Sequence, residues 1–369
     1  MCFGIVIPDY ALALAPGDVI EDLTPIFDDT SAAFAPNGFG SPAVSWDDRL
    51  NRWVMVMEYL SGTTDPACPH GLWGLALSTT TDPEGDDRLS WTPPEILYEP
   101  SVDGTYKSCV TAHPATLWVY TAPGVTNNRR MVVLFKAESD LNSAACTAVD
   151  ADPSTCVLTG IGSMNVRFNF DGSLFAAPTP APNLRIATPD EIIGFQSPAY
   201  LTSTGQFYLL IQKETIVIPG GPTTFALYST TSTTGLSWSL PTLVQSPGAY
   251  SWTGNELFGQ ELICAANGDL VSFQGGRTWQ GGGTSISEAG MGLMPSTDNG
   301  VTFTLDPTPI VSWFDDFDMR HWSVVRVGDD AYRMWVVNKD PSDNHLAIYY
   351  AQAFGAGAVV TAPVDRYCP

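Results

Sequence analysis

The sequence RHWSVVRVGDDAYRMWVVNKD, residues 320–340, contains a short apolar strand, a polar turn and a second strand rich in aromatic and β-branched residues. Copies of this pattern recur roughly every 60 to 85 residues, and a repeat of this length with a hairpin inside it is typical of one β-propeller blade. The other copies are SPAVSWDDRLNRWVMVMEY (41–59), HPATLWVYTAPGVTNNRRMVVLFKAE (113–138), SPAYLTSTGQFYLLIQKE (197–214) and QELICAANGDLVSFQGGR (260–277).

A second pattern follows three of these hairpins, at residues 71–97, 224–244 and 291–311. Each copy has a strand, a polar turn that contains Gly or Asp, and a final strand flanked by proline. Together the two patterns predict an all-β, five-bladed propeller in a single domain over residues 1–369, with almost no helix. We expect its blades to start near residues 41, 113, 197, 260 and 320.

Residues 1–40 precede the first hairpin. Within them, the stretch 19–34 resembles the outer strand and the following loop of a blade. Propellers commonly complete one blade with strands from both chain ends, which removes an exposed strand edge. We therefore expect this segment to complete the last blade, so that N- and C-terminal strands close the ring.

A short turn motif supports the blade assignment. Residues 296–303 read STDNGVTF, which matches the Asp-box turn S-x-D-x-G-x-T-aromatic. In such a turn the Asp298 and Thr302 side chains close the loop, and the aromatic Phe303 packs between blades. The motif therefore predicts a structural turn and not a catalytic one.

The charge of the chain excludes some partners. It has 39 Asp and Glu against 16 Lys and Arg, a net charge of −23 at pH 7. Such a chain repels nucleic-acid phosphates and anionic membrane surfaces. No stretch of the sequence is long and apolar enough to form a transmembrane segment. We expect neither a nucleic-acid partner nor a membrane span.

The seven cysteines indicate the compartment. Cys146 and Cys156 bracket a polar loop, for which a loop-closing disulfide is the natural interpretation. Disulfides imply export, so we expect an extracellular or cell-surface protein. Cys2 directly follows Met1 and would suit a lipid anchor. For the others, the sequence suggests a bridge between Cys68 and Cys109, a buried free thiol at Cys264 and a C-terminal tether at Cys368.

Propeller geometry predicts where a ligand would bind. In antiparallel blades, the starts of the first strands and the ends of the second strands meet at one central pocket. A pocket ringed by carboxylates, cations and amides suits a polyhydroxylated ligand such as a carbohydrate. The candidate catalytic residues are Glu58 and Glu261. The candidate ligand-binding residues are Ser41, His113, Glu138, Gln196, Glu214, Glu256, Arg277, Arg320 and Lys339.

The pattern resembles the five-bladed propeller glycoside hydrolases, of the arabinanase and β-xylosidase type, and their invertase-like relatives. The residues that carry the resemblance are Ser41-Pro42-Ala43-Val44 with the strand 53–59, and Arg320-His321-Trp-Ser323-Val324-Val325 with the strand 332–335. In that family a histidine at the place of His321 commonly helps to hold a central metal, often calcium, or a water. The resemblance therefore implies a calcium ion in the central channel; the alternative is a His321 that only packs in the fold.

The family's acidic residues are missing here. The positions of its general base, its second Asp and its general acid fall on Ser41, His113 and Gln196. Hydrolysis in this family needs two carboxyl groups beside the scissile bond. Either other acidic residues have taken over, or the site binds a glycan without cutting it. The acidic residues that could take over are Glu58, Glu138, Glu214, Glu256 and Glu261.

Three other functions stay open. A lectin-like binding module and a structural or assembly propeller would have the same fold, because fold alone does not determine function. A sialidase is suggested by the Asp box and by the placing of Arg277 and Arg320. The Arg-Ile-Pro motif of sialidases is absent from the sequence.

Overall fold

The structure is a computed structural model, and its strands account for nearly all of its regular elements. Among the described residues, the helical elements are the 3₁₀ turns η1 (Arg88–Ser90) and η4 (Ser251–Thr253). The fold is therefore all-β, as the sequence predicts. The described residues are 14, 19–63, 65–68, 71–99, 109–120, 129–138, 159–178, 193–215, 224–235, 238–280, 285–313, 321–339, 345–364 and 366–368.

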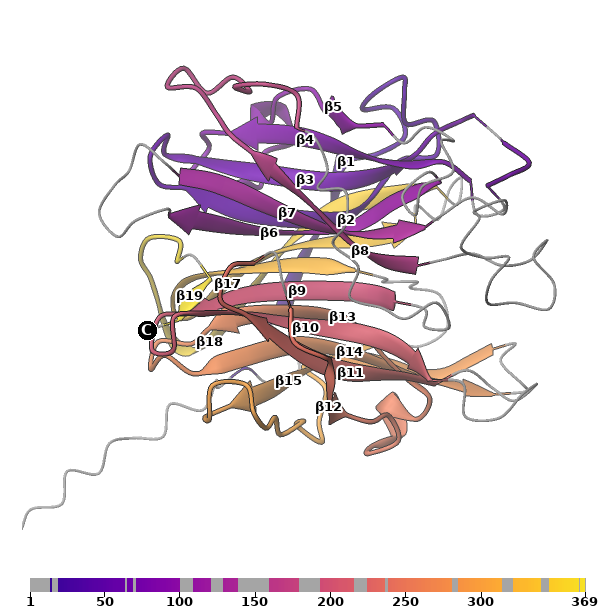
Figure 1. Cartoon of the computed structure of the whole chain (residues 1–369), viewed down its shortest axis with the longest axis vertical. Coiled ribbons are helices and arrows are strands. Elements are labelled where there is room, and N and C mark those ends of the chain that lie inside the picture. Colours follow the sequence, from indigo (N-terminus) through magenta and orange to yellow (C-terminus); the bar gives the residue numbers. More distant parts are fainter. Residues whose placement is uncertain are drawn as a thin grey trace, which may run out of the picture.

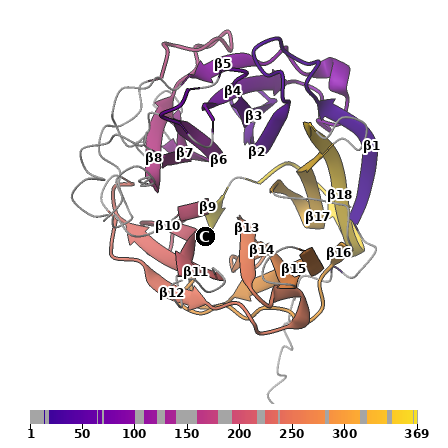
Figure 2. The ribbon, with the colours of Figure 1, turned by 90° about the vertical axis from the view of Figure 1, so that its right-hand side faces the viewer.

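The strands form consecutive antiparallel groups arranged around a centre (Figures 1 and 2). The first strand of each group lies innermost, and the later strands follow outward (Figure 2). The groups are β2 (Phe39–Asp47), β3 (Arg52–Leu60), β4 (Trp73–Thr80) and β5 (Glu95–Tyr98); then β6 (Val110–Tyr120), β7 (Arg129–Glu138) and β8 (Thr159–Val166); then β9 (Ile193–Leu201), β10 (Gln206–Thr215), β11 (Thr224–Ser232) and β12 (Thr242–Gln245); then β13 (Glu256–Cys264), β14 (Leu270–Gln280), β15 (Ser285–Ser296) and β16 (Val311–Trp313); then β17 (Trp322–Lys339) and β18 (Leu346–Val360).

The chain ends join strands that are distant in sequence. β1 (Val19–Phe27) pairs antiparallel with β18 and lies outside it (Figure 2). The C-terminal β19 (Tyr367–Cys368) instead pairs parallel with β9. The innermost strands also form a continuous series of contacts, in which β2, β6, β9, β13 and β17 each touch the next and β17 touches β2.

Large aromatic residues fill the space between the first and last groups. Trp53 of β3 and Trp335 of β17 are fully buried, with ring centroids 5.2 Å apart. Both belong to one cluster of buried hydrophobic residues, and aromatic pairs of this kind contribute strongly to a core. The indole N–H groups donate to the carbonyls of Pro83 and Gly85 respectively. The loop after β4 therefore seals this junction.

The disulfides confirm one sequence prediction and correct another. Cys68 and Cys109 are bonded, with Cα atoms 5.4 Å apart, as predicted. Cys264 is not a free thiol: it is bonded to Cys368. Sequence reasoning missed this pair because 104 residues separate the two cysteines and only the ring brings β19 beside β13. Cys2, Cys146 and Cys156 lie outside the described residues.

The turn at residues 296–303 is closed by its own side chains. Asp298 accepts hydrogen bonds from the Thr302 backbone N–H at 2.8 Å and from the Thr302 hydroxyl at 2.5 Å. Ser296 Oγ also donates to Asp298, at 2.8 Å. Phe303 is buried and lies beside Tyr208 of β10, with ring centroids 6.3 Å apart. The turn thus holds an aromatic residue against the neighbouring group.

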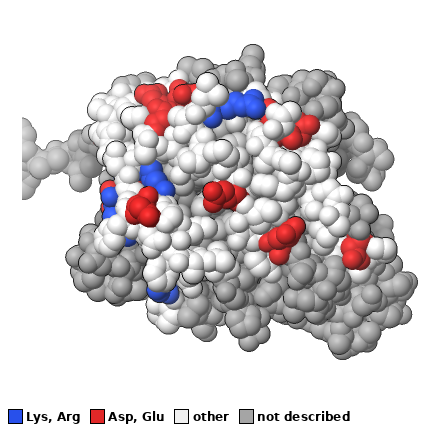
Figure 3. All heavy atoms as spheres, turned by 90° about the horizontal axis from the view of Figure 1, so that it is seen from above, with Lys and Arg blue, Asp and Glu red and all other residues white. Residues whose placement is uncertain are grey.

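No helix in the part of the chain that the structure describes is long and apolar enough to cross a membrane. On the face seen in Figure 3, acidic side chains occur at several separate places, with basic ones between them. Mixed charges of this kind are typical of a solvated surface.

Candidate functional site

The site begins at two bulges in the innermost strands. The pairing of β2 with β3 shifts between Gly40 and Ala43, and that of β6 with β7 shifts between Ala112 and Ala115. Inside these bulges Ser41 has φ 39° and His113 has φ 49°, in the left-handed region that non-glycine residues rarely adopt. A bulge turns a side chain away from its usual direction and is frequent next to functional sites. Local strain of this kind therefore marks both positions as candidates.

The two strained residues meet each other and Glu58 of β3. Ser41 Oγ lies 2.9 Å from His113 Nδ1, and Glu58 Oε2 lies 3.2 Å from the same nitrogen. Glu58 Oε2 also accepts the His113 backbone N–H at 2.6 Å. Burial alone would raise the pKa of Glu58, but the charge and hydrogen bonds of His113 hold it at about 2. Glu58 is thus an ionised, buried carboxylate that fixes His113.

This trio differs from a nucleophilic triad. In a Ser–His–acid triad the serine and the acid contact different nitrogens of the imidazole. Here Ser41 and Glu58 both approach Nδ1 of His113, so these contacts do not engage Nε2. A quarter of the His113 side chain, 23%, is exposed, whereas the Glu58 side chain is 5% exposed. His113 is therefore the member of the trio that can meet a ligand.

Residues from the third and fifth groups complete this end of the centre. The Gln196 amide donates to the His113 carbonyl oxygen. The Phe195 ring lies 4.2 Å from the His113 ring and stacks on His321 at 4.8 Å with an angle of 19°. His113 and His321 have ring centroids 6.0 Å apart. The sequence-derived candidates Ser41, Glu58, His113, Gln196 and His321 are thus brought together.

His321 is deeply buried and neutral. Burial, helped by the neighbouring His113, lowers the pKa of His321 to about 3. Its Nδ1 and the Gln196 Oε1 atom are both buried without a hydrogen-bond partner. Calcium prefers six or more oxygen ligands, and no group of three metal-ligating side chains occurs in the described ranges. One imidazole and one amide oxygen do not match that preference, so the donor set does not fit a calcium site.

Glu261 of β13 lies in a different environment from Glu58. Its carboxylate accepts hydrogen bonds from Ser197 Oγ at 3.0 Å and Ser323 Oγ at 3.1 Å, and it forms an ion pair with Arg366. Only 4% of the Glu261 side chain is exposed. Burial raises its pKa, against the opposing effect of Arg366. Arg366 and two serines thus engage the Glu261 carboxylate.

The remaining candidates are arranged in local pairs. Glu256 and Arg277 form an ion pair at 3.0 Å, and Glu138 pairs with Lys136 at 2.6 Å. The Arg277 guanidinium also lies over the Phe258 ring at 4.1 Å. Arg320 and the side chains of Glu214 and Lys339 lie outside the described part of the chain.

Sequence reasoning missed three contributors: Phe195, Ser323 and Arg366. Phe195 directly precedes Gln196, and an aromatic residue next to a predicted polar site residue is a usable signal for a packing or stacking role. Ser323 lies within the motif at residues 320–325, but nothing in that motif marks it as a partner of Glu261. Arg366 had no local signal, because its partner Glu261 is 105 residues away.

Sequence comparisons give no relatives: neither a protein-family model nor a curated protein matches this chain. Solved structures do match. They include a β-1,2-mannobiose phosphorylase from Listeria innocua in complex with β-1,2-mannobiose, with a TM-score of 0.61, 10% identity and coverage of 91% of this chain and 96% of that one.

Two further structures match over similar lengths. An endo-arabinase from Bacteroides thetaiotaomicron has a TM-score of 0.57 and 13% identity, covering 90% of this chain and 97% of that one. An N-acetylgalactosamine deacetylase from F. plautii, in complex with blood group B trisaccharide, has a TM-score of 0.58 and 12% identity, covering 90% and 96%. At such low identities the likeness establishes the fold alone. The chain therefore has the fold of the propeller glycoside hydrolases, as the sequence motifs suggest.

Proposed function

We propose that this protein is a carbohydrate-binding propeller whose central site, around His113, holds a glycan without cleaving it by the two-carboxylate mechanism. The observation that carries the proposal is the hydrogen-bonded cluster of Ser41, His113 and Gln196, the positions where the resembling family has its acids. A serine, an imidazole and an amide offer donors and acceptors for sugar hydroxyls. The fold neighbours that carry bound saccharides support the choice of ligand class.

The state of the two candidate catalytic acids supports binding over hydrolysis. The low pKa of Glu58 removes it as a general acid, because an acid must carry a proton at working pH. The Glu261 carboxylate is engaged by two serines and Arg366. Hydrolysis needs one protonated and one ionised carboxyl group on opposite sides of the same bond. Neither residue is placed to supply either role in its present contacts.

The fold and location form part of the same proposal. The strand groups around the centre correspond to five blades, and the β1–β18 pairing corresponds to ring closure by both termini. The two disulfides among the described residues suit an oxidising compartment, which supports an extracellular or cell-surface protein. A ring of this kind presents one face of the central site to external glycans.

One observation favours a second candidate, an enzyme that uses His113 as a general base. A carboxylate that holds one side of an imidazole fixes its orientation and raises its basicity at the other nitrogen. Glu58 has this relation to His113. Such a base would activate water or a sugar hydroxyl. The variant Glu58→Gln, which removes the carboxylate that orients His113, would then lose activity and retain binding.

A glycan array combined with a panel of chromogenic glycosides and acetyl esters separates the functions. Saturable binding without turnover supports a binding function. This binding should be lost in His113→Ala and kept in the control Glu95→Gln, which changes an exposed residue of β5. Turnover that disappears in His113→Ala supports the enzyme. If wild-type protein shows neither binding nor turnover across the array, the proposal fails and a structural propeller is favoured.

A further inference from the structure

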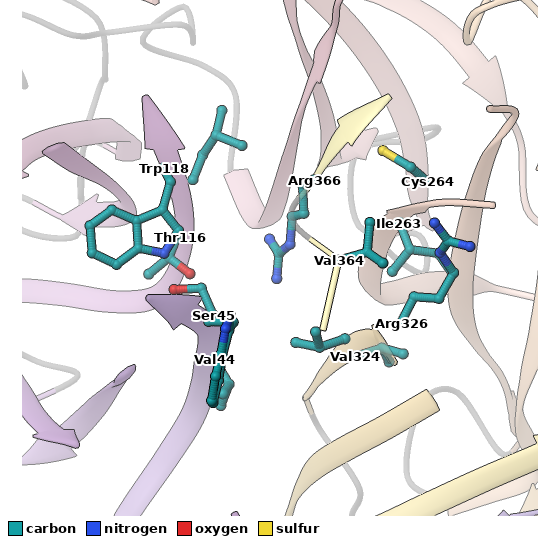
Figure 4. Close-up of a pocket in the computed structure, with 13 residues that line it drawn as sticks. Val44, Ser45, Thr116, Trp118, Ile263, Cys264, Val324, Arg326, Val364 and Arg366 are labelled. Carbon is teal, nitrogen blue, oxygen red and sulfur yellow. The ribbon is translucent and has the colours of Figure 1, made fainter. Parts of the chain in front are cut away.

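A separate pocket lies at the opposite ends of the innermost strands (Figure 4). It is lined by residues of β2, β6, β13 and β17 and by the C-terminal segment that leads into β19. Two arginines, Arg326 and Arg366, line it, and none of the described residues around it is Asp or Glu. The whole chain has a net charge of −23, so the charged residues that line this pocket have the opposite sign to the chain as a whole.

Three polar groups of this pocket are buried without a hydrogen-bond partner: Arg366 Nη1, Thr116 Oγ1 and Arg326 Nε. Thr116 is 1% exposed and Arg366 is 8% exposed. Figure 4 shows Arg366 reaching from the C-terminal segment toward Thr116 of β6 and Ser45 of β2. A buried N–H or O–H group that lacks an acceptor costs about 1–3 kcal/mol. Such groups are normally satisfied by a bound water or ion.

The charges of the pocket favour an anion. Glu261 pairs with Nη2 of Arg366 and leaves Nη1 free of a partner. Asp329 lies 3.8 Å from Arg326, but its side chain is 75% exposed, so water screens this pair strongly. Among the described residues, Arg366 Nη1 and Arg326 Nε thus lack an acceptor at this pocket, and N–H groups of cationic side chains suit an anion.

The size of the pocket limits the occupant. The cavity has a volume of about 10 Å³, close to the least that holds one small atom or water. A phosphate or sulfate, with four oxygens around a central atom, needs more room. A monatomic anion needs the least room of the common anions, so it suits this space better than a polyatomic oxyanion does.

We propose that this pocket binds one monatomic halide, chloride in physiological conditions, held by the Arg366 guanidinium and the Thr116 hydroxyl. The ion joins strand β6 to the C-terminal segment. That segment is fixed on its other sides by the Cys264–Cys368 disulfide and by the hydrogen bond from the Tyr200 N–H to the Arg366 carbonyl at 2.9 Å. Halide binding therefore stabilises the closed ring. This inference is independent of the glycan site, so either can fail without the other.

The first experiment is thermal unfolding of the full chain at constant ionic strength, with chloride, bromide, fluoride or gluconate as the anion. Only the folded chain holds the site, so Tm rises with halide concentration. Bromide scatters anomalously, so a crystal grown in bromide locates the ion directly. We expect a peak between Arg366 and Thr116, and Tm higher in chloride and bromide than in gluconate.

Thr116→Val tests the site while the fold is kept, because it replaces an unpaired hydroxyl with an apolar group of the same shape. Loss of a donor to a charged ligand weakens halide binding by about tenfold or more. The matched control is Ser272→Ala, which removes another buried, unpartnered hydroxyl that does not line the pocket. Arg366→Gln is a second variant, expected to abolish the halide effect.

The inference is overturned by an equal halide dependence of Tm in wild type and Thr116→Val, or by none in wild type. A crystal with bromide that shows only a water at the pocket also overturns it. A loss of the halide effect in Ser272→Ala would show that the effect is not local to this pocket, which likewise contradicts the proposal.

Discussion

Replacement of Glu58 by glutamine should destabilise the protein in a way that depends on pH. The folded structure lowers the pKa of this carboxyl from 4.5 to about 2. A difference of roughly 2.5 corresponds to about 3 kcal/mol, since each pKa unit is worth about 1.4 kcal/mol. The amide of glutamine keeps the shape of the side chain but lacks the negative charge that contacts His113. We therefore expect Glu58→Gln to lose about 3 kcal/mol of the free energy of unfolding at pH 7.

The sign of the pH dependence follows from the direction of the shift. Because the folded pKa of Glu58 is depressed, its stabilisation is fully present above pH 4.5 and is lost as the pH falls toward 2. At pH 3 about 2 kcal/mol of it has gone, so the difference between wild type and Glu58→Gln narrows to about 1 kcal/mol. Titrating groups that do not contact residue 58 are common to both proteins and cancel in the difference.

The assay is urea unfolding of both proteins at pH 7 and pH 3, with the disulfides intact. The matched control is Glu95→Gln in β5, an exposed acid, which should change the free energy of unfolding by less than about 0.5 kcal/mol at either pH. A difference between wild type and Glu58→Gln that stays constant from pH 7 to pH 3 would refute the argument. It would mean that the His113 contact does not set the pKa of Glu58.

Three further predictions concern the ring and its centre. Cys264→Ser should cost about 2–5 kcal/mol by urea unfolding, because its disulfide closes a loop of about 100 residues; a loss no larger than that of a surface substitution would contradict this. Trp335→Ala should cost about 3–5 kcal/mol, and the exposed control Leu240→Ala, 89% exposed, should cost little; equal losses would refute the role of the indole in the junction. The donor set around His321 does not suit calcium, so we expect equal Tm values in calcium and in chelator; a Tm raised by calcium in wild type and not in His321→Ala would contradict this.

The sequence predicted the repeating strands well because hairpin periodicity is local. Alternation in residues 41–59 and 197–214, with polar turns between, determines β2, β3, β9 and β10 to within a few residues. The prediction that Val19 begins an outer strand also has a structural counterpart, since β1 pairs with β18. Propensity and turn chemistry act over a few residues, so one copy of the repeat is enough to show them.

Contacts between distant segments were the part that the sequence did not reveal. The interpretation of Cys264 as a free thiol was wrong because its apolar strand is the usual setting of a buried cysteine. The partner Cys368 comes from a tail whose path over the ring depends on β19 pairing with β9. The same tail brings Arg366 to Glu261. The sequence around Cys264 does not indicate Cys368, and the sequence around Glu261 does not indicate Arg366.

Glu58 and Glu261, the two buried acidic residues near the centre, have different neighbours. Glu58 contacts the His113 backbone and ring, on the side where Phe195 and His321 stack. Glu261 contacts Ser197 and Arg366, toward the pocket closed by the C-terminal segment. Glycoside hydrolysis requires two carboxyl groups about 5 to 9.5 Å apart with a sugar between them. Each carboxylate here instead contacts its own basic residue, Glu58 with His113 and Glu261 with Arg366. We therefore expect the ligand of the proposed site to meet His113, whose side chain is partly exposed and contacts Glu58.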